Sequence, residues 1–131
     1  MNNKLDKILA EISAGELIDK ITILEIKKIK ILNKEKLEEI NKELTSLNDT
    51  MNKFIKDKSK VLDLKKLLKD INLKLWEIED GKRLAEKNND FGPKFVELAR
   101  NVYKFNDERA KLKLAINNTL GSNIKEVKSY E

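Results

Sequence analysis

The sequence predicts an all-α fold, an antiparallel helical bundle or a set of coiled-coil hairpins with about four helices. Charged residues make up 39% of the 131 residues and apolar residues 40%, whereas aromatic residues account for only 5%. Such a composition is typical of long helices that are covered by Lys and Glu and pack through a narrow apolar stripe. The chain contains one proline and four glycines, so few positions would interrupt a helix. We therefore expect a single helical domain over residues 1–131, ending in an irregular tail at 122–131.

The first helix is expected over residues 14–32, and Ser13 and Glu16 have the spacing of a capping box at its start. The apolar side chains that follow recur at helical spacing. They form a wide stripe, at Leu17, Ile18, Ile21, Leu24, Ile29, Ile31 and Leu32. A stripe of this width indicates contact with more than one neighbouring helix. Residues 1–12 are compatible with either a short helix or an extended segment.

The second helix is expected over residues 34–56, after a break at Asn33. Its apolar residues alternate by three and four positions, at Leu37, Ile40, Leu44, Leu47, Met51 and Phe54. This spacing is typical of a coiled-coil seam, and the remaining positions are mainly Lys, Glu, Asn, Ser and Thr. The pattern therefore predicts a helix whose role is packing.

The third helix is expected over residues 60–88, with Ser59 as its N-cap. Its apolar stripe consists of Leu64, Leu68, Ile71, Leu75 and Ile78. Gly81 follows within the same helix, where a glycine costs about 1 kcal/mol relative to alanine. A glycine at this position predicts either the close approach of a neighbouring helix or a kink.

The fourth helix is expected over residues 93–119, after a polar loop. Pro93 suits the first turn of a helix, and Gly121 suits the position that ends one. The connections between the four expected helices are short. Short connections predict that consecutive helices run in opposite directions.

The residue types that are absent exclude several classes of function. The chain has no histidine and no cysteine, so disulfides, thiolate metal sites and the commonest general base are missing. It also lacks the glycine-rich phosphate-binding loops, the HExxH motif and the Ca²⁺-loop pattern. We therefore expect no metal and no cofactor, and a chain without cysteine fits a reducing cytoplasm. No apolar run approaches the ~18 to 20 residues that span a bilayer, so we expect no transmembrane segment.

The basic residues are distributed in an informative way. The net charge is +5, but lysines and acids alternate along the whole chain, unlike the clustered basic residues and stacking aromatics of a nucleic-acid surface. We therefore do not expect nucleic-acid binding. Of the 28 basic residues only Arg83, Arg100 and Arg109 are arginines. In a chain whose other basic residues are lysines, these positions indicate sites that need a guanidinium, which is planar and has five hydrogen-bond donors.

Antiparallel packing of the third and fourth helices predicts which charged residues meet. If the hairpin folds about residue 90, Arg100 comes level with Asp80 and Glu79. On the first helix, the residues level with Arg109 are Glu25 and Asp19. The same comparison of positions along the helices places Lys113 near Asp19.

This polar region has two interpretations that the residues leave open. In the first, ion pairs fix the register of the helices, with Asp19, Glu25 and Lys113 as partners. In the second, a groove binds an anionic or polar ligand through Trp76, Glu79, Asp80, Arg100, Tyr103, Asn106 and Arg109. A catalytic version of that groove would use Asp80 or Glu79 as acid or base and Tyr103 as a donor.

Several segments resemble those of a known family. They are GELIDKITILEIK (15–27), LWEIED (75–80), FVELARNVYKFNDERAKLKLAIN (95–117) and GSNIKEVKSY (121–130). In this order and over most of the chain, they resemble an uncharacterised family of short bacterial and phage proteins, a domain of unknown function. The resemblance implies an all-helical domain that occurs alone or attached to other domains. It implies no particular reaction.

The sequence favours a non-catalytic interaction or scaffold module over an enzyme. We expect a cytoplasmic protein of bacterial or phage origin. We expect a homodimer, because narrow apolar stripes on 131 residues leave apolar surface to cover, and a further protein partner is possible. The alternative is a small-ligand (anionic) binding protein or a small helical enzyme. It would use the polar cluster between the first, third and fourth helices.

Overall fold

The computed structural model describes residues 4–128, which contain four α-helices, one short 3₁₀ helix and no strand. The elements are α1 (Ala14–Lys30), α2 (Lys34–Phe54), η1 (Lys58–Val61), α3 (Leu62–Lys87) and α4 (Pro93–Leu120). The all-α prediction is confirmed, and the expected helix boundaries differ from the observed ones by at most two residues. Residues 4–12 are not helical, and residues 122–128 form neither helix nor strand. The expectations for residues 1–3 and 129–131 lie outside the described range.

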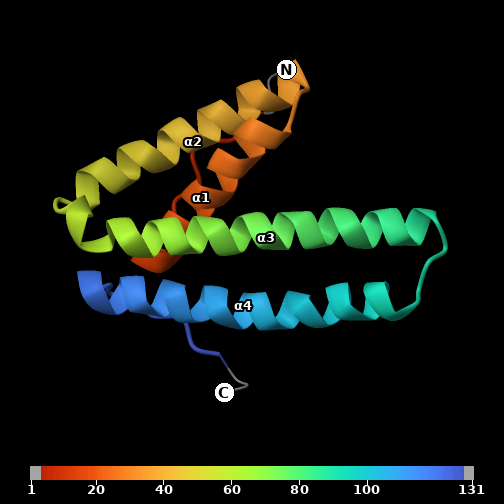
Figure 1. Ribbon diagram of the computed structural model, residues 1–131. Helices are drawn as coiled ribbons and strands as arrows, with labels where there is room; N and C mark the ends of the chain where they lie inside the picture. Colours follow the sequence, from red (N-terminus) through yellow and green to blue (C-terminus); the bar gives the residue numbers. More distant parts are fainter. Residues whose placement is uncertain (1–3, 129–131) are drawn as a thin grey trace.

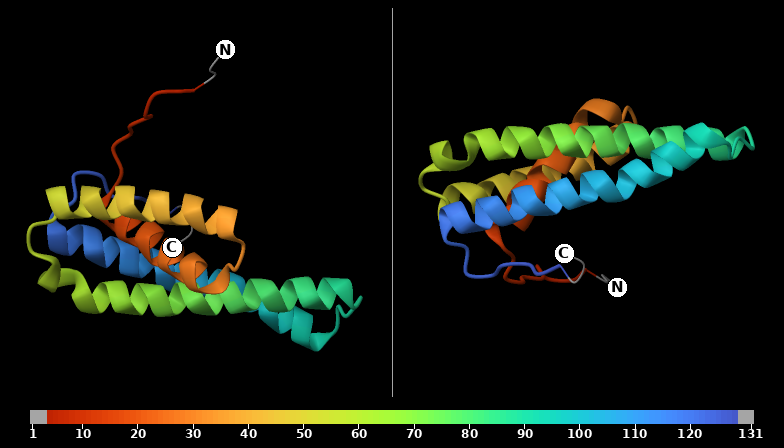
Figure 2. Two further views of the ribbon diagram at one scale, coloured as in Figure 1. Left: turned by 90° about the horizontal axis from the view of Figure 1, so that it is seen from above. Right: turned by 60° about the horizontal axis from the view of Figure 1, so that its bottom comes forward.

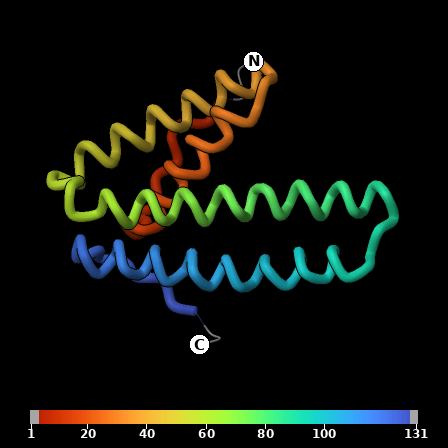
Figure 3. Tube along the Cα trace, viewed as in Figure 1, coloured from red at the N-terminus to blue at the C-terminus, as the bar shows by residue number. Residues whose placement is uncertain are grey.

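The central helix of the fold is α1, which packs against α2 on one side and against both α3 and α4 on the other. Figure 1 shows α3 and α4 as a long antiparallel hairpin, while α1 and α2 form a second hairpin that crosses it at an angle. The tube trace in Figure 3 shows the same crossing and the short turns that join α1 to α2 and α2 to α3. The up-and-down order predicted from the short connections is therefore present.

The hydrophobic core lies where α1 meets its neighbours. Its buried members include Leu17, Ile18, Ile21 and Leu24 of α1, Ile40 and Leu44 of α2, Leu68 of α3 and Ile116 of α4. The wide stripe predicted for α1 thus contacts three helices. Two residues expected to widen it do not, since Ile29 is 70% exposed and Leu32 is 89% exposed. Both lie at the end of α1 or in the following turn, where Figure 1 shows the α1–α2 hairpin extending away from α3 and α4.

The helix ends follow from local hydrogen bonds. The side chain of Ser13 accepts a hydrogen bond from the backbone N–H of Glu16, as a serine N-cap does. Only this half of the expected capping box forms, because the Glu16 carboxylate contacts Lys113 instead. Asn33 caps α2 through Lys36 N–H.

Local chemistry also determines the connection before α3 and the two ends of α4. The N-cap expected at Ser59 is wrong: Asp57 caps the short 3₁₀ helix η1 and accepts hydrogen bonds from Ser59, which lies inside it. Pro93 opens α4 as predicted. Gly121 ends it in the left-handed conformation, at φ 63°, where a residue without Cβ is favoured.

Two glycines allow close helix contacts. A Cβ added to Gly15 would collide with the backbone carbonyl oxygen of Lys113 and would lie 3.0 Å from Oδ1 of Asn117, so α1 approaches the α4 backbone directly. A Cβ on Gly81 would lie 3.2 Å from a methyl group of Leu98, and α3 runs through this position as one continuous helix. Of the two possibilities raised for Gly81, the structure therefore shows the close approach.

One end of the α3–α4 hairpin projects beyond α1 and α2 in both views of Figure 2. We call this projecting part the arm, which comprises residues 76–87 of α3, the loop 88–92 and residues 93–106 of α4. The rest of the described chain is the base. Within residues 4–128, no helix combines the length and hydropathy needed to cross a membrane.

Candidate functional site

The centre of the candidate site is an ion pair between α1 and α4. Arg109 Nε donates to Asp19 Oδ1 at 2.9 Å, and Arg109 Nη2 donates to Asp19 Oδ2 at 2.5 Å. Asp19 is only 1% exposed, whereas the Arg109 side chain is 29% exposed. A guanidinium in this position binds both carboxylate oxygens through two parallel hydrogen bonds, which a lysine cannot do.

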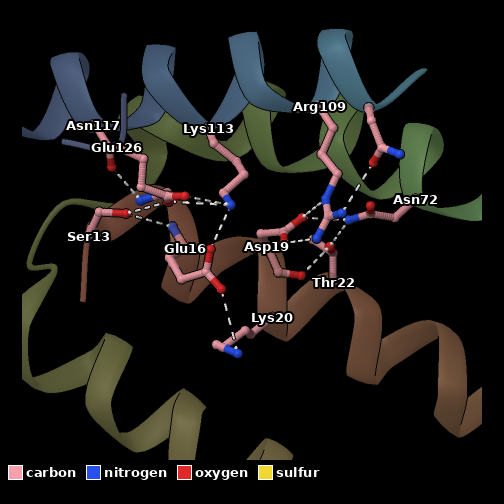
Figure 4. Close-up of polar contacts among 12 residues, drawn as sticks. Ser13, Glu16, Asp19, Lys20, Thr22, Asn72, Arg109, Lys113, Asn117 and Glu126 are labelled. Carbon is pink, nitrogen blue, oxygen red and sulfur yellow. Dashed lines mark hydrogen bonds and ion pairs between the residues drawn. The ribbon is translucent and has the colours of Figure 1, made fainter. Parts of the chain in front are cut away.

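Three further polar side chains complete this pair (Figure 4). Asn72 of α3 donates from Nδ2 to Asp19 Oδ1 and to Thr22 Oγ1, each at 2.9 Å. Thr22 in turn donates to the backbone oxygen of Asp19, and Asn106 accepts from Arg109 Nη1 at 3.4 Å. We call these five residues (Asp19, Thr22, Asn72, Asn106 and Arg109) the polar layer. It joins α1, α3 and α4 at one level.

A second group lies about one turn nearer the start of α1. Lys113 Nζ contacts Glu16 Oε2 at 2.6 Å and Glu126 Oε1 at 3.3 Å, and Ser13 Oγ donates to the same Glu126 oxygen at 3.2 Å. Asn117 Oδ1 accepts from the N–H of Gly15 at 2.6 Å. This terminal cluster (Ser13, Glu16, Lys113, Asn117 and Glu126; Figure 4) ties the start of α1 to α4 and to the tail.

The surroundings favour the ionised forms in both groups. Burial by itself raises the pKa of Asp19. The hydrogen bonds from Arg109 and Asn72 and the charge of Arg109 have a larger effect in the opposite direction, so the pKa lies below its ordinary value. The hydrogen bond with Asp19 raises the pKa of Arg109.

The Glu16–Lys113 pair shows the same balance. Burial raises the pKa of Glu16, yet Lys113 brings it below the ordinary value. Burial lowers the pKa of Lys113, yet Glu16 raises it above the ordinary value. Both partners of each pair are therefore charged at neutral pH.

The polar atoms of the layer are paired mainly with one another. Both Asp19 oxygens are occupied by donors from α3 and α4. Over residues 4–128, every buried side-chain nitrogen and oxygen has a hydrogen-bond partner. Within that same range no group of three or more Asp or Glu side chains could hold a metal ion. The layer thus presents neither a free base nor a set of metal ligands.

Comparison with known proteins places the chain in a family. A family model described as a family of unknown function, DUF6165, matches residues 8–131. The chain belongs to the DUF6165 family. No curated protein and no solved structure matches it. The polar layer and the terminal cluster lie entirely inside the part of the chain that the DUF6165 model covers.

The ion pairs expected in this DUF6165 chain form with some changes of partner. Of the two acids expected near Arg109, the structure brings Asp19 to it. Glu25 instead contacts Lys65 and Lys69 of α3, each at 3.4 Å. Lys113 was expected near Asp19 but pairs with Glu16 and Glu126, because α1 lies about one helical turn along α4 from the expected register.

The pairing expected for Arg100 does not form among residues 4–128. Arg100 and Asp80 are both exposed, and the ion pair of Glu79 is with Lys82 on the same helix, at 3.2 Å. Residues at one level of an antiparallel hairpin meet only if they also face each other. Arg100 points away from α3 and lines an open groove of about 600 Å³ at the end of the arm, together with Phe91, Pro93, Val96 and Lys104.

The structure therefore does not bring the seven ligand-binding candidates together in one site. Arg109 and Asn106 belong to the polar layer, Arg100 lines the groove at the tip, and Asp80 lies on the exposed surface of α3. Trp76 and Glu79 are half-exposed residues of the arm, and Tyr103 is 55% exposed. Neither that groove nor a second one, beside the α1–α2 turn and lined in part by Ile31 and Ile40, includes Trp76 or Tyr103.

Sequence reasoning missed two buried members of the polar layer, Asn72 and Thr22. Asn72 is 6% exposed and lies beside the apolar stripe of the third helix, and no polar partner was predicted for it. The available signal was its place next to Ile71 and four residues after Leu68, on the buried side of α3. Likewise, the partner role of Glu126 was missed because that residue lies in the tail, whose path no periodicity predicts.

Proposed function

We propose that this DUF6165 chain is a non-catalytic interaction or scaffold module. The base is a rigid frame, and the arm is the element that meets a protein partner. The observation that carries this proposal is that the arm projects beyond α1 and α2 (Figure 2) and has exposed apolar side chains. Leu84, Phe91, Val96 and Tyr103 of the arm are all between 50% and 60% exposed. Apolar side chains gathered on a projecting element are a feature of protein interaction sites.

The role we assign to the polar layer is to fix the register and crossing angle of α1 on the α3–α4 hairpin. Asp19 is held at once by α3 and α4, so a slip of either helix by one turn would leave a buried carboxylate without its donors. The pairs of Glu25 with Lys65 and Lys69, and of Lys113 with Glu16, act in the same direction from more exposed positions. A frame held in this way gives the arm a defined direction.

The alternative function, a small anionic ligand or a reaction at the polar cluster, has less support. It requires donors that point into open space between α1, α3 and α4. The donors of Arg109 and Asn72 that have been described point instead at Asp19, Thr22 and Asn106. We keep the cytoplasm of a bacterium or an infected cell as the place of action. This part of the proposal rests on the cysteine-free sequence and on the family resemblance.

Site-specific photo-cross-linking in the source cells tests the proposed function. A photo-reactive amino acid is placed at position 99 on the exposed surface of the arm, and as a control at position 42 on the exposed surface of α2. We expect discrete covalent adducts from position 99 and none from position 42. Adducts from position 42 alone, or none from either position in folded protein, would overturn the proposal.

A further inference from the structure

The arm carries a stripe of side chains that continues the surface on which α1 rests. On α3, Asn72 binds Asp19 of α1, and helical spacing puts Trp76, Glu79 and Arg83 on the same face further along. On α4, the stripe runs from Arg109 toward the tip through Asn106, Val102, Ala99 and Phe95. α1 covers only the base end of this stripe, since the arm lies beyond α1 in both views of Figure 2.

We infer that a second copy of this chain covers the stripe, with the two arms antiparallel about a twofold axis. The charges on the stripe are self-complementary. Glu79 and Arg83 stand one helical turn apart, so pairing the two α3 helices about residue 81 puts each Glu79 opposite the other copy's Arg83. An isologous contact of this kind makes two ion pairs from one arrangement. Among residues 4–128 Arg83 makes no ion pair, and the ion pair of Glu79 is with Lys82, three residues further along the same helix.

The same symmetry also matches the aromatic side chains of the stripe. Gly81 lies beside Leu98 within one hairpin, which sets the level of α3 against α4. A pairing centred on residue 81 therefore brings Trp76 level with residue 86 of the second copy, which lies beside residue 93 of the same hairpin and about half a turn from its Phe95. Phe95 already packs edge-to-face on Phe91, with ring centroids 5.4 Å apart. In this arrangement the two Glu79–Arg83 pairs lie nearest the axis and the aromatic side chains flank them on both sides. Aromatic residues are enriched in specific interfaces.

The length of the free arm fits this arrangement. With the axis at residue 81, residue 90 at the tip of one copy comes level with Asn72 of the other. Asn72 is in contact with α1, to which it donates a hydrogen bond. The overlap therefore uses the part of the stripe that lies between Asn72 and the tip.

This inference rests on the proposed function, because it names the partner of the arm. Light scattering coupled to gel filtration of the full chain tests it, across a range of micromolar concentrations. We expect twice the chain mass of 15.2 kDa. Glu79→Arg and Arg83→Glu should each weaken the dimer about tenfold or more, since each places like charges opposite one another. Glu77→Arg, an equal charge change on a different face of α3, is the matched control and should leave the dimer intact.

Mixing the two weakened variants gives the decisive result. In a heterodimer of Glu79→Arg with Arg83→Glu, every contact again joins opposite charges, so the mixture should dimerise although neither variant does so alone. A change in helix stability within one chain cannot produce that rescue. A wild-type mass of 15.2 kDa, or a dimer that neither substitution weakens, would overturn the inference. The proposed function would survive the first of these results if position 99 cross-linked to a different protein in cells.

Discussion

Arg109 holds both carboxylate oxygens of Asp19, a residue 90 positions earlier in the chain, and Asn72 of α3 donates to the same carboxylate. One buried acid thereby joins three helices. A buried ion pair of this kind adds little net stability compared with apolar residues of equal volume, but it is costly to break. We propose that its consequence is specificity, because the crossing of α1 over the hairpin seen in the structure gives both Asp19 oxygens their donors.

Replacing Arg109 with methionine should destabilise the protein strongly. The substitution leaves the buried Asp19 carboxylate without its charged partner, and we expect a loss of ~3 to 5 kcal/mol in the free energy of unfolding. Urea titration followed by circular dichroism measures it. Arg100→Met is the matched control, since Arg100 is exposed on the arm, and it should change the stability by ~0.5 kcal/mol or less. Equal effects of the two substitutions would contradict a structural role for Arg109.

Removing both partners should cost less than the two single losses combined. We expect the double variant Asp19→Leu with Arg109→Met to show a coupling free energy of ~0.5 to 3 kcal/mol in a double-mutant cycle. The comparison cycle uses Glu25→Leu and Lys69→Met, a partly exposed pair between α1 and α3, for which ~0.2 to 1 kcal/mol is expected. Strict additivity at Asp19 and Arg109 would mean that the contact seen in the structure is not energetically coupled.

Gly15 and Gly81 should respond in opposite ways to alanine. At Gly15 the new Cβ would meet the backbone of Lys113, which cannot move without separating α1 from α4, so the protein should lose stability and melt at a lower temperature. At Gly81 the new Cβ would meet only a flexible Leu98 methyl group, while the helix gains up to ~1 kcal/mol in propensity. Thermal unfolding of the two variants side by side measures the contrast. A Gly15→Ala protein as stable as Gly81→Ala would argue against the close contact.

Acid should weaken the protein through Asp19 and Glu16. The pKa of each carboxyl group is lower in the folded than in the unfolded chain. Their stabilisation is therefore fully present above the unfolded pKa, about 4, and is lost as the pH falls through the folded pKa. Urea midpoints measured from pH 7 down to pH 2 should decline below about pH 5. The decline should be shallower in Asp19→Asn. A profile of the same slope in that variant would show that other groups govern acid unfolding.

The helices and their order were predictable because local chemistry specifies them. Pro93, Gly121 and the serine at position 13 act within a few residues of their own positions, and the apolar stripes need only the helical period. The importance of Arg109 was also predictable, since arginine is rare in this chain. Arg109 also falls at a position of helical spacing that is otherwise apolar, at Leu98, Val102, Phe105, Leu112 and Ile116. Comparing positions along the packed helices by their rise per residue left two acids as candidate partners of Arg109, one of which is Asp19.

The sequence did not predict the rotation of each helix about its own axis or the register of each helix against its neighbours. Arg100 and Asp80 lie near one level of the hairpin, but they do not face each other. Lys113 reaches Glu16 and not Asp19, because α1 lies about one turn along α4 from the expected register. The hydrogen bonds of Asn72 depend on where α1 lies against α3. Such relations arise from packing among all the helices at once, so spacing within a single helix cannot supply them.

The central claim is that the polar layer is a closed structural joint and not a binding site. Side-chain NMR of the arginine Nε–H groups tests it most directly, because the chain has only three arginines. We predict that the Arg109 Nε–H exchanges with water much more slowly than those of Arg83 and Arg100, and that added phosphate or citrate leaves its resonance unmoved. An Arg109 signal that exchanges as fast as that of Arg100, or that shifts in a saturable way with either anion, would contradict the claim.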